Sequence, residues 1–388
     1  MVKKINFLLI HGQDGYTGAP YVFSNLITSI LSSTNTRVTL IYIKTESGFL
    51  KNLAHPHLTS IKVQFPFLNI KSLRLASYFY LFGVAFIYVL RSLAVNRRFQ
   101  YSILNTIPTL IFLPAARLFR IKTISYLHEL SLTPKIMSFL FLKINKIFAR
   151  KSVCVSKSHF SRLALFLPTS SEVIYNSCSP QDEILFQKIA LQNTSKMFSS
   201  PFIVSMASSA TPGKGLFSFM QLALKANQLR DYSNLRFKLH LSLGGMHKPE
   251  DLLKMLATLI NFDLSQLHNI DIFFDSSIEE IFSETNLFLN LSDPEFGWFE
   301  TFGLTCLQAS CCAIPTIVSY KDCGPSEIID DNYSGFHCDV GNIDQILSFI
   351  SLYSNEKLYR TFASNALKSS KKYSFSTFSA NWHALLNI

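Results

Sequence analysis

Residues 292–329, SDPEFGWFETFGLTCLQASCCAIPTIVSYKDCGPSEII, carry the pattern that decides the fold of this 388-residue chain. A polar loop leads to Glu300, a short helix is expected to begin after Gly303, and Pro315 ends that helix before an apolar strand. The first turn of a helix presents unpaired backbone amides and the positive end of the helix dipole. Because glycine lets the backbone approach a ligand closely, this turn is a natural seat for a diphosphate.

Two polar side chains accompany this expected helix. Glu300 stands just before its first turn, where the carboxylate can accept hydrogen bonds from sugar hydroxyls, and Gln308 lies two turns inward, where its amide can bond a ribose. An ordinary turn between strand and helix with a surface glutamate would explain the helix, but not the combined spacing. These residue types can therefore recognise a diphosphate and hydroxyl groups.

Outside this segment, short apolar runs alternate with longer helical patterns. We expect strands at 6–10, 37–43, 102–105, 122–127 and 152–156 in the first half, and at 202–207, 238–243, 270–274, 287–291 and 316–319 in the second. We expect helices in the first half at 20–31, 75–94 and 134–151. Repeated strand-helix-strand order indicates parallel sheets covered on both faces, so the chain is predicted to be α/β with two Rossmann-like, doubly wound domains.

The chain length also fits two domains. The polar stretch 181–200 is the expected linker between an N-terminal domain at 1–180 and a C-terminal domain at 201–371. A closing helix is expected at 372–388.

Charge is distributed unevenly between these domains. Residues 1–180 contain 21 basic and four acidic side chains, whereas the whole chain has a net charge of +11, so the remainder is acidic. This asymmetry indicates two modules with different partners.

The stretch from Lys135 to Lys157 interleaves basic and apolar residues. Its basic side chains include Lys143, Lys146, Arg150 and Lys151. An amphipathic basic helix suits an anionic membrane surface, and a solvated face on a core-packed helix is the alternative. Nucleic-acid binding is not expected, because no recognition motif accompanies the charge.

Composition suits a protein that works against lipid, although an AT-rich genome would give the same bias: charged residues make up 16% and there are 35 phenylalanines. The longest uncharged stretch, 75–90, falls short of the roughly 20 residues needed to span a bilayer, so a buried or interfacial helix is expected.

The apolar run at 5–10 is too short for a signal peptide. Seven cysteines without metal-binding spacing indicate reduced thiols. We therefore expect a cytoplasmic protein, peripheral at the inner face of the cell membrane.

The segment 292–329 resembles the signature of the retaining GT-B glycosyltransferases called glycosyl transferases group 1 (family 4-like). That signature is E-x-F-G-L, a second glutamate eight residues after the first, G-x-P, and a G-G-x-x-E loop. The residues that match are Glu300, Phe302, Gly303, Leu304, Pro315, Gly324 and Glu327. Gln308 replaces the second glutamate, while Ala313 and Cys323 replace glycines, and glutamine can still bond a diol. The resemblance implies a donor site that includes Phe302, Gly303, Leu304, Thr305, Gln308 and Glu327.

Residues 203–216, IVSMASSATPGKGL, are similar to the strand and K-G loop that opens the C-terminal domain in this family. The counterpart Lys214 would neutralise the donor diphosphate, whose charge grows in the transition state. The family usually places an arginine five or six residues earlier, where this chain has Ser208 and Ser209. A solvated turn is the alternative for the K-G dipeptide taken alone.

Two segments of the first half extend the resemblance. The loop GQDGYTGAP at 12–20 is similar to the family's glycine-rich loop, so Gly15 and Gly18 are expected near the diphosphate and acceptor; a purely structural turn is the alternative. It lacks the dinucleotide fingerprint, so neither NAD nor another cofactor is expected. SYLHEL at 125–130 resembles the family's apolar strand ending in histidine, and His128 is the counterpart, expected in the interdomain cleft near the transferred sugar.

The resemblance runs over nearly the whole chain. It implies two parallel sheets facing a central cleft and a C-terminal helix that crosses back to the first domain. The implied enzyme is a metal-independent, hexosyltransferase-type glycosyltransferase, with Glu300 and His128 as its catalytic residues. It would move a sugar, with retention, from a nucleotide-diphosphate sugar to a saccharide or lipid-linked acceptor in polysaccharide or glycolipid assembly, such as lipopolysaccharide or capsule.

Two alternatives stay open. A catalytically silent GT-B protein that scaffolds a partner transferase is favoured by Gln308, Cys323 and the missing arginine. A GT-B sugar-nucleotide epimerase would not explain the basic, lipid-facing half.

Overall fold

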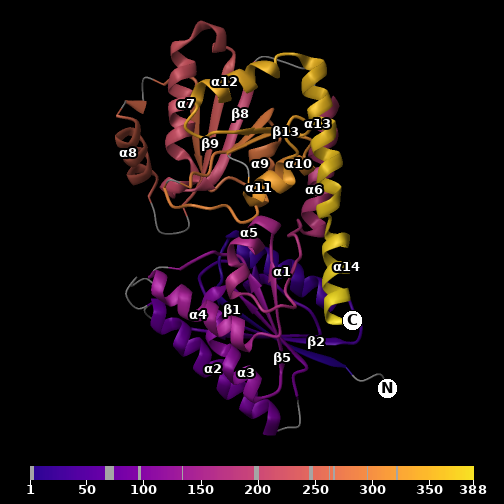
Figure 1. Cartoon of the computed structure of the whole chain (residues 1–388). Coiled ribbons are helices and arrows are strands. Elements are labelled where there is room, and N and C mark those ends of the chain that lie inside the picture. The colour runs from indigo at the N-terminus through magenta and orange to yellow at the C-terminus, as the bar shows by residue number, and fades with distance from the viewer. Residues whose placement is uncertain are drawn as a thin grey trace. The chain divides into compact units, whose positions relative to one another are not determined.

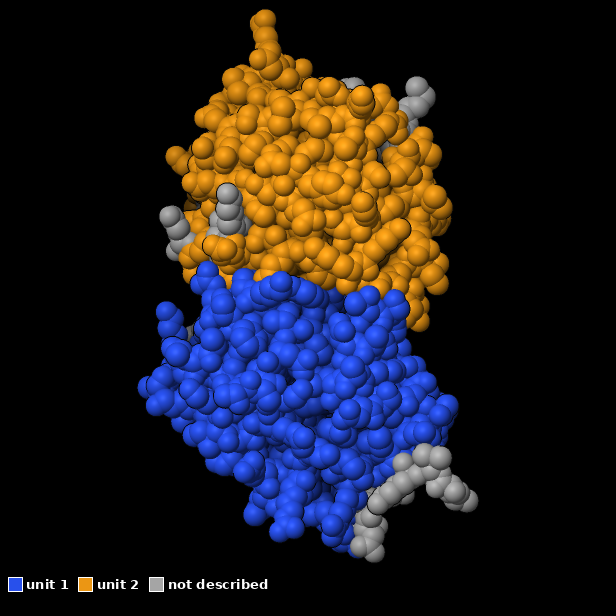
Figure 2. Space-filling view, turned by 45° about the vertical axis from the view of Figure 1, so that its right-hand side comes forward, with its two compact units in different colours: residues 1–177, 375–388 blue, residues 178–374 orange. Residues whose placement is uncertain are grey.

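A computed structural model divides the chain into two compact units, shown in different colours in Figure 2. Unit 1 comprises residues 1–177 and 375–388, and unit 2 comprises residues 178–374. The structure describes residues 4–65, 74–94, 98–132, 134–195, 201–243, 248–261, 263–264, 267–294, 296–319 and 322–388.

Unit 1 is built on a parallel sheet of seven strands in the order β3-β2-β1-β4-β5-β6-β7. Its strands are β1 (Ile5–Gln13), β2 (Thr36–Ile43), β3 (Leu58–Val63), β4 (Tyr101–Asn105), β5 (Lys122–Leu127), β6 (Lys151–Cys154) and β7 (Glu172–Val173). The chain runs outward from β1 to β3 and then returns to the other side of β1 as β4. Ligands of doubly wound sheets bind at the carboxyl ends of the strands beside such a reversal, which here lies between β1 and β4.

Helices cover both faces of this sheet (Figure 1). They are α1 (Gly18–Leu31), η1 (Leu50–Asn52), α2 (Arg74–Ala94), η3 (Ile107–Phe112), α3 (Leu113–Leu118), α4 (Lys135–Phe148), α5 (Lys157–Leu163), η4 (Ala164–Phe166) and α14 (Phe375–Leu386). Alternate residues of a strand point to the same face. Leu8 and Ile10 of β1 accordingly share a buried cluster with Leu81 of α2 and Phe141 of α4.

The C-terminal helix α14 packs on α1 within unit 1. Its buried residues Phe378, Trp382 and Leu386 recur every four positions, which gives the helix one apolar face. Trp382 meets Tyr126 of β5 edge to face, with 4.9 Å between ring centroids. The hydroxyl of Ser379 lies 2.7 Å from that of Ser29 on α1, so polar contacts flank the apolar one.

Unit 2 repeats this topology with six parallel strands in the order β10-β9-β8-β11-β12-β13. Its strands are β8 (Phe202–Ser209), β9 (Leu235–Ser242), β10 (Ile270–Phe274), β11 (Leu287–Asn290), β12 (Thr316–Ser319) and β13 (Gly335–Cys338). The strand order reverses between β8 and β11. This second reversal is the expected ligand position of unit 2.

The helices of unit 2 form two groups, with α7, α8 and α12 on one face of the sheet and α6, α10 and α13 on the other (Figure 1). The bounds are α6 (Pro180–Ser195), η5 (Pro212–Lys214), α7 (Leu216–Gln228), α8 (Pro249–Ile260), α9 (Ile278–Phe282), α10 (Leu304–Cys311), α11 (Gly324–Ile328), α12 (Ile343–Leu352) and α13 (Glu356–Ser370). Two parallel α/β units of this kind confirm the predicted fold class.

The stretch 181–200, expected as a linker, is instead mostly the helix α6, and residues 196–200 lie outside the described residues. The helix packs on α9, α10 and α13, and its buried residues Phe186, Ile189, Ala190 and Asn193 share one face, where Phe186 meets Phe282 of α9. Asn193 also donates a hydrogen bond of 2.9 Å to the carbonyl oxygen of Cys312. The surrounding polar residues hid this narrow packing face in the sequence.

The basic helix is shorter than expected. α4 ends at Phe148, because Ala149 has an extended backbone (φ −70°, ψ 140°) and leads into β6. Lys151 therefore lies on a strand, and Arg150 lies between helix and strand. The expected helix at 134–151 is wrong in this last turn.

α2 confirms the expected long apolar helix. Among the described residues, α2 is the one helix long and apolar enough to cross a membrane, with a mean hydropathy of 1.4 in the stretch Ala76–Ala94. Of this stretch, 28% is buried. The core helix of a soluble protein can have the same length and composition. Leu81, Ala85 and Val89 on one of its faces are buried, whereas Phe79 on another is half exposed. One stripe of α2 thus packs on the sheet while another meets solvent.

Candidate functional site

A lysine and a glutamate meet at the strand reversal of unit 2. Lys214 follows β8 and Glu300 follows β11, and the Lys214 ammonium donates a hydrogen bond to Oε2 of Glu300. Their side chains are 17% and 18% exposed, so the ion pair is largely shielded from water. The structure therefore brings together two of the residues that the sequence predicted, although 86 positions separate them.

Backbone contacts hold the K-G loop against the end of β11. The amide of Asp293 donates to the carbonyl oxygen of Gly213 at 2.8 Å. Gly215 has φ 81°, and a Cβ there would lie 1.9 Å from the carbonyl oxygen of Leu291. Only glycine fits this position, which explains why it follows Lys214.

Trp298 completes the group, and the sequence analysis missed it. The Lys214 Nζ lies 4.5 Å from the centroid of the Trp298 ring, within range of a cation–π interaction. The indole Nε1 also donates to Oε2 of Glu300 at 3.4 Å. An aromatic residue two positions before the predicted glutamate was the available signal.

The ion pair controls the protonation of Glu300. Burial favours the neutral acid, but the neighbouring Lys214 ammonium and the hydrogen bonds from Lys214 and Trp298 outweigh it, so the pKa of Glu300 lies below its ordinary value. Glu300 is consequently a carboxylate at neutral pH. It can accept hydrogen bonds from hydroxyl groups but cannot donate one.

The helix α10 begins as predicted, at Leu304 after Gly303. Gly303 has φ 88°, and its carbonyl oxygen accepts from the amides of Cys306 and Leu307. The amides of Leu304 and Thr305 precede these bonds in the first turn, where a helix has no carbonyl groups to receive them. This turn directly follows the Glu300 loop, and the first turn of a helix is a position that can bind an anion.

The other predicted donor-site residues differ in exposure. Phe302 is buried and packs edge to face on Tyr373, with 6.0 Å between ring centroids, so its side chain supports the loop. Gln308 is buried on α10. Glu327 is half-buried on α11, and its carbonyl oxygen accepts from Lys372 at 3.2 Å.

In unit 1, His128 directly follows β5 and is hydrogen-bonded to Asn105 at the end of β4. Burial, followed by the neighbouring His159 and His11, holds the pKa of His128 well below its ordinary value. His128 is therefore neutral at physiological pH. It lies at the carboxyl ends of the strands, where the resemblance to the family places its counterpart.

The glycine-rich loop of unit 1 is organised by Asp14, which the sequence analysis did not single out. Its carboxylate accepts from the backbone amides of Gly15 at 2.8 Å, Leu50 at 3.1 Å and Lys51 at 2.9 Å. Gly15 is half-buried and Gly18 is exposed at the start of α1. Asp14 thus joins the loop after β1 to the 3₁₀ turn η1.

The basic residues expected at a membrane have different environments. Lys143 and Lys146 are exposed on α4, where Nζ of Lys143 lies 4.3 Å from the Phe139 ring centroid. Arg150 is also exposed. Lys151 pairs instead with Glu172 of β7 at 2.9 Å. Three of the four are therefore exposed, although the Lys146 ammonium donates to the carbonyl oxygen of Leu165 at 2.8 Å, whereas Lys151 is held in an ion pair.

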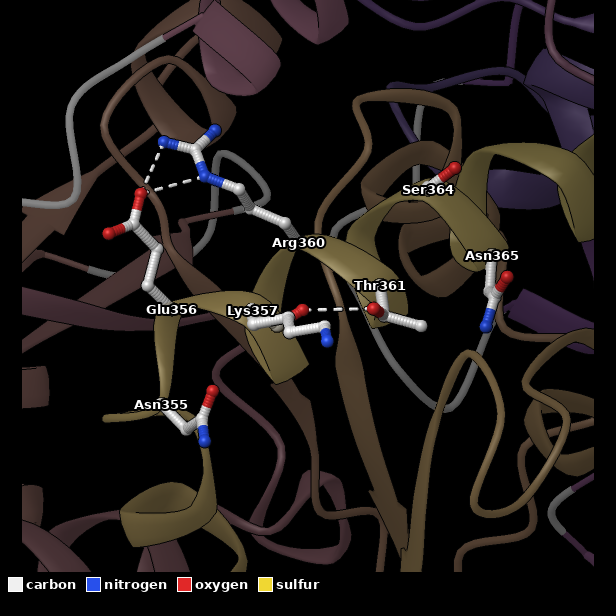
Figure 3. A pocket seen from close by; sticks show the side chains of 7 residues that line it. All are labelled: Asn355, Glu356, Lys357, Arg360, Thr361, Ser364 and Asn365. Atoms are coloured by element: carbon white, nitrogen blue, oxygen red, sulfur yellow. Dashed lines mark hydrogen bonds and ion pairs between the residues drawn. The ribbon is translucent and has the colours of Figure 1, made fainter.

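A separate pocket of unit 2 lies along α13 (Figure 3). Its lining residues are Asn355, Glu356, Lys357, Arg360, Thr361, Ser364 and Asn365. Nη2 of Arg360 lies 2.7 Å from Oε1 of Glu356, so two of its charges neutralise each other. Because this lining comes almost entirely from the surface of one helix, we assign the pocket no function. Among the residues that the structure describes, no cluster of three or more His, Cys, Asp or Glu side chains could hold a metal ion.

Residues 196–369 match the family described as glycosyl transferases group 1. The fold of the whole chain is similar to that of HepE from Anabaena in complex with UDP-glucose, with a TM-score of 0.72, 17% identity and 99% of each chain covered. It is also similar to sucrose-phosphate synthase from Thermosynechococcus elongatus, with a TM-score of 0.75, 13% identity, and 99% of this chain and 98% of that chain covered. The chain has the GT-B fold, and its residues 196–369 match the glycosyl transferases group 1 family.

Curated relatives of this GT-B protein match over shorter stretches. Poly(glycerol-phosphate) alpha-glucosyltransferase of Bacillus subtilis is 29% identical over 124 residues, which are 28% of this chain and 18% of the relative. Sucrose synthase of Beta vulgaris is 44% identical over 54 residues, 14% of this chain and 7% of the relative. The matches thus span less than a fifth of the length of either relative.

Proposed function

We propose that this GT-B protein is a glycosyltransferase that binds a nucleotide-diphosphate sugar on unit 2. The observation that carries the proposal is the group formed by Lys214, Glu300 and Trp298 beside the first turn of α10. This group supplies a cation, an ionised acceptor and helix amides at one strand reversal. These are the groups that a diphosphate joined to a sugar needs for recognition.

The same residues account for transfer. When the bond between sugar and diphosphate breaks, negative charge grows on the leaving diphosphate, and Lys214 with the amides of Leu304 and Thr305 would stabilise it. Glu300 would accept hydrogen bonds from the hydroxyls of the transferred sugar. We propose His128 of unit 1 as a second contact of that sugar, and transfer with retention. Gln308 would bond the ribose, and Glu327, Gly15 and Gly18 would lie around the donor.

Two kinds of comparison support this choice of chemistry. HepE from Anabaena is described in complex with UDP-glucose, and the lipopolysaccharide outer core galactosyltransferase WaaB is a further GT-B neighbour, with a TM-score of 0.68, 15% identity and 99% of each chain covered. The Bacillus subtilis relative is named as a glucosyltransferase. We therefore propose a saccharide or lipid-linked acceptor in polysaccharide or glycolipid assembly.

We further propose that unit 1 works at the inner membrane surface. Several large apolar side chains of α2, α3, α4 and η4 are exposed, namely Phe79, Tyr80, Ile87, Leu90, Leu118, Ile136, Phe139, Leu140, Ile147 and Leu165. α4 contacts both α3 and η4, and α2 and α4 both contact η3, so these elements are neighbours. The exposed Lys143, Lys146 and Arg150 add positive charge. Apolar side chains with adjacent cations suit an anionic lipid surface.

Thermal unfolding with UDP-, GDP- and dTDP-sugars tests the donor site, because a bound donor stabilises the folded chain. We expect one nucleotide class to raise the Tm, and Lys214→Ala to remove the shift. Lys188→Ala is the matched control, because Lys188 is also an ion-paired lysine of unit 2 but belongs to α6. Glu300→Gln should then lower the rate of transfer, through a loss on the order of 2–4 kcal/mol of transition-state stabilisation. A shift that survives Lys214→Ala would contradict the proposed site.

A silent scaffold is the second candidate, and the end of β8 favours it. Ser208 and Ser209 stand where the family resemblance leads one to expect a cation, and Gln308 stands where it leads one to expect a glutamate. A scaffold predicts that no nucleotide-sugar shifts the Tm and that Lys214→Ala leaves partner binding unchanged.

A further inference from the structure

His128 is the end of a hydrogen-bonded chain that starts on β1. His11 of β1 and Asn105 of β4 face each other in the sheet register, on the two strands that flank the reversal. Nδ1 of His11 lies 2.8 Å from the Asn105 amide nitrogen, and the Asn105 amide oxygen lies 2.8 Å from Nε2 of His128. His11 and Asn105 are buried.

The other end of the chain fixes its direction. Nε2 of His11 lies 3.0 Å from the carbonyl oxygen of Gln13, and a carbonyl oxygen only accepts hydrogen bonds, so Nε2 of His11 must donate. In a neutral imidazole the other nitrogen, Nδ1, then has to accept. The amide nitrogen of Asn105 is therefore the group that faces His11. Its oxygen faces His128 and accepts from Nε2–H.

The surroundings keep both rings neutral. Burial lowers the pKa of His11 to about 4, and burial also holds the pKa of His128 well below its ordinary value. The titratable groups around His128 are His11 from β1, Tyr126 of β5 with 4.3 Å between ring centroids, the adjacent Glu129, and His159 from α5, whose Nε2 is 3.1 Å from the Glu129 carbonyl oxygen. Burial raises the pKa of Glu129 to about 7, so this carboxyl supplies only partial negative charge at neutral pH.

We propose that His11 and Asn105 are positioning residues that set His128 as a neutral ring protonated on Nε2. His128 then meets a bound sugar as a neutral ring and not as a cation. The role toward the sugar rests on the proposed function, whereas the control of the ring by Asn105 does not. No sequence motif indicated this series of hydrogen bonds, because Asn105 is 94 positions from His11 and 23 positions from His128.

Asn105→Asp tests the proposal with a side chain of the same shape. A carboxylate cannot donate to His11, and a negative charge at this distance raises the pKa of a neighbouring histidine by about one to three units. Nitrogen NMR of the full chain with ¹⁵N-labelled histidine rings gives the readout, with His128→Gln to assign the signal. In the unaltered chain we expect one protonated Nε2 and one bare Nδ1 at pH 7. In Asn105→Asp we expect an upward shift of the pKa of His128.

Asn145→Asp is the matched control. Asn145 is equally buried in unit 1, but its side chain bonds to Ser152 and to the carbonyl oxygen of Phe166. It should leave the His128 signal unchanged. If Asn105→Asp does not fold, His11→Phe removes the acceptor instead, and His128 should then populate both neutral tautomers. An Nδ1–H or doubly protonated ring in the unaltered chain at pH 7, or a His128 pKa that Asn105→Asp does not move, would overturn the proposal.

Turnover separates this inference from the proposed function. If the protein transfers sugar, the pH dependence of kcat/KM should shift to higher pH in Asn105→Asp. It should be unchanged in Asn145→Asp. If the NMR result is as expected but no donor is used, the positioning role stands and the proposed function fails. If transfer occurs while the ring is charged or reversed, the positioning role fails alone.

Discussion

Among the described residues of unit 2, three glycines have positive φ but different surroundings, which predicts a graded cost of replacing each with alanine. A Cβ at Gly215 would lie 1.9 Å from the carbonyl oxygen of Leu291, and one at Gly303 would lie 2.6 Å from Cγ of Pro325. A Cβ at Gly297 would meet nothing within 4 Å. Their φ angles of 81°, 88° and 74° are similar, so the series separates close contact from backbone strain.

The magnitudes follow from these contacts. A non-glycine residue in the left-handed region costs about 1–2 kcal/mol, so Gly297→Ala should lower the free energy of unfolding of unit 2 by that amount. Gly215→Ala adds an overlap with a backbone oxygen, and overpacking of this kind costs about 1–3 kcal/mol more. We therefore expect a loss of about 2–5 kcal/mol for Gly215→Ala. Gly303→Ala should fall between them, because the proline ring can shift.

Urea unfolding followed by tryptophan fluorescence measures these costs. The chain has two tryptophans, Trp298 in unit 2 and Trp382 in unit 1, so a Trp382→Phe background leaves the indole of unit 2 as the reporter. Nucleotide-sugar binding should weaken in Gly215→Ala, which displaces Lys214, but not in Gly297→Ala. Equal costs for Gly215 and Gly297 would refute the close approach of the K-G loop to β11.

Further predictions concern unit 1. Trp382→Ala should destabilise unit 1 by about 3–5 kcal/mol in urea, well beyond Trp382→Phe, because it empties the contact with β5; equal effects would refute this packing. Burial raises the pKa of Glu129 from 4.5 to about 7, so its contribution to stability is complete below about pH 4.5 and is lost as the pH rises through 7. Glu129→Gln should remove this decline, up to about 3 kcal/mol, from the pH dependence of unfolding, and an unchanged profile would contradict it. Charge reversal at Lys143, Lys146 and Arg150 should lower partitioning onto anionic vesicles by more than about 100-fold at low salt, since the loss of each cation alone removes about 1 kcal/mol; unchanged partitioning would make α4 a solvated face.

The sequence predicted the sheets and the two segments that form the donor-side group. Glu300 and Lys214 could be named because each stands in a segment that resembles a motif of the family, in which a glycine turn leads into a helix. Their direct pairing could not be deduced, because it depends on how β8 and β11 adjoin. Trp298 was missed for the same reason: its partner Lys214 is 84 positions away.

The elements that the sequence analysis missed have weak local signals. β3 is an edge strand whose residues are mostly half-buried or exposed, and β13 is an edge strand of four residues, so neither presents a long apolar run. α6 buries one narrow face amid polar residues, which made it resemble a linker. His11 and Asn105 were also missed, because both lie inside apolar strands and acquire a role only through the register of β1 and β4.

The position of α14 has a consequence for synthesis on the ribosome. Unit 1 needs residues 375–388, and Trp382 from this segment is completely buried, yet these residues are translated after all of unit 2. Unit 2 is one continuous segment and can fold as soon as it emerges, whereas unit 1 must wait with its α1 face uncovered. During translation the N-terminal domain usually folds first, but here unit 1 can complete its folding only after unit 2 has been made. The incomplete unit 1 is therefore the part that a chaperone would have to protect.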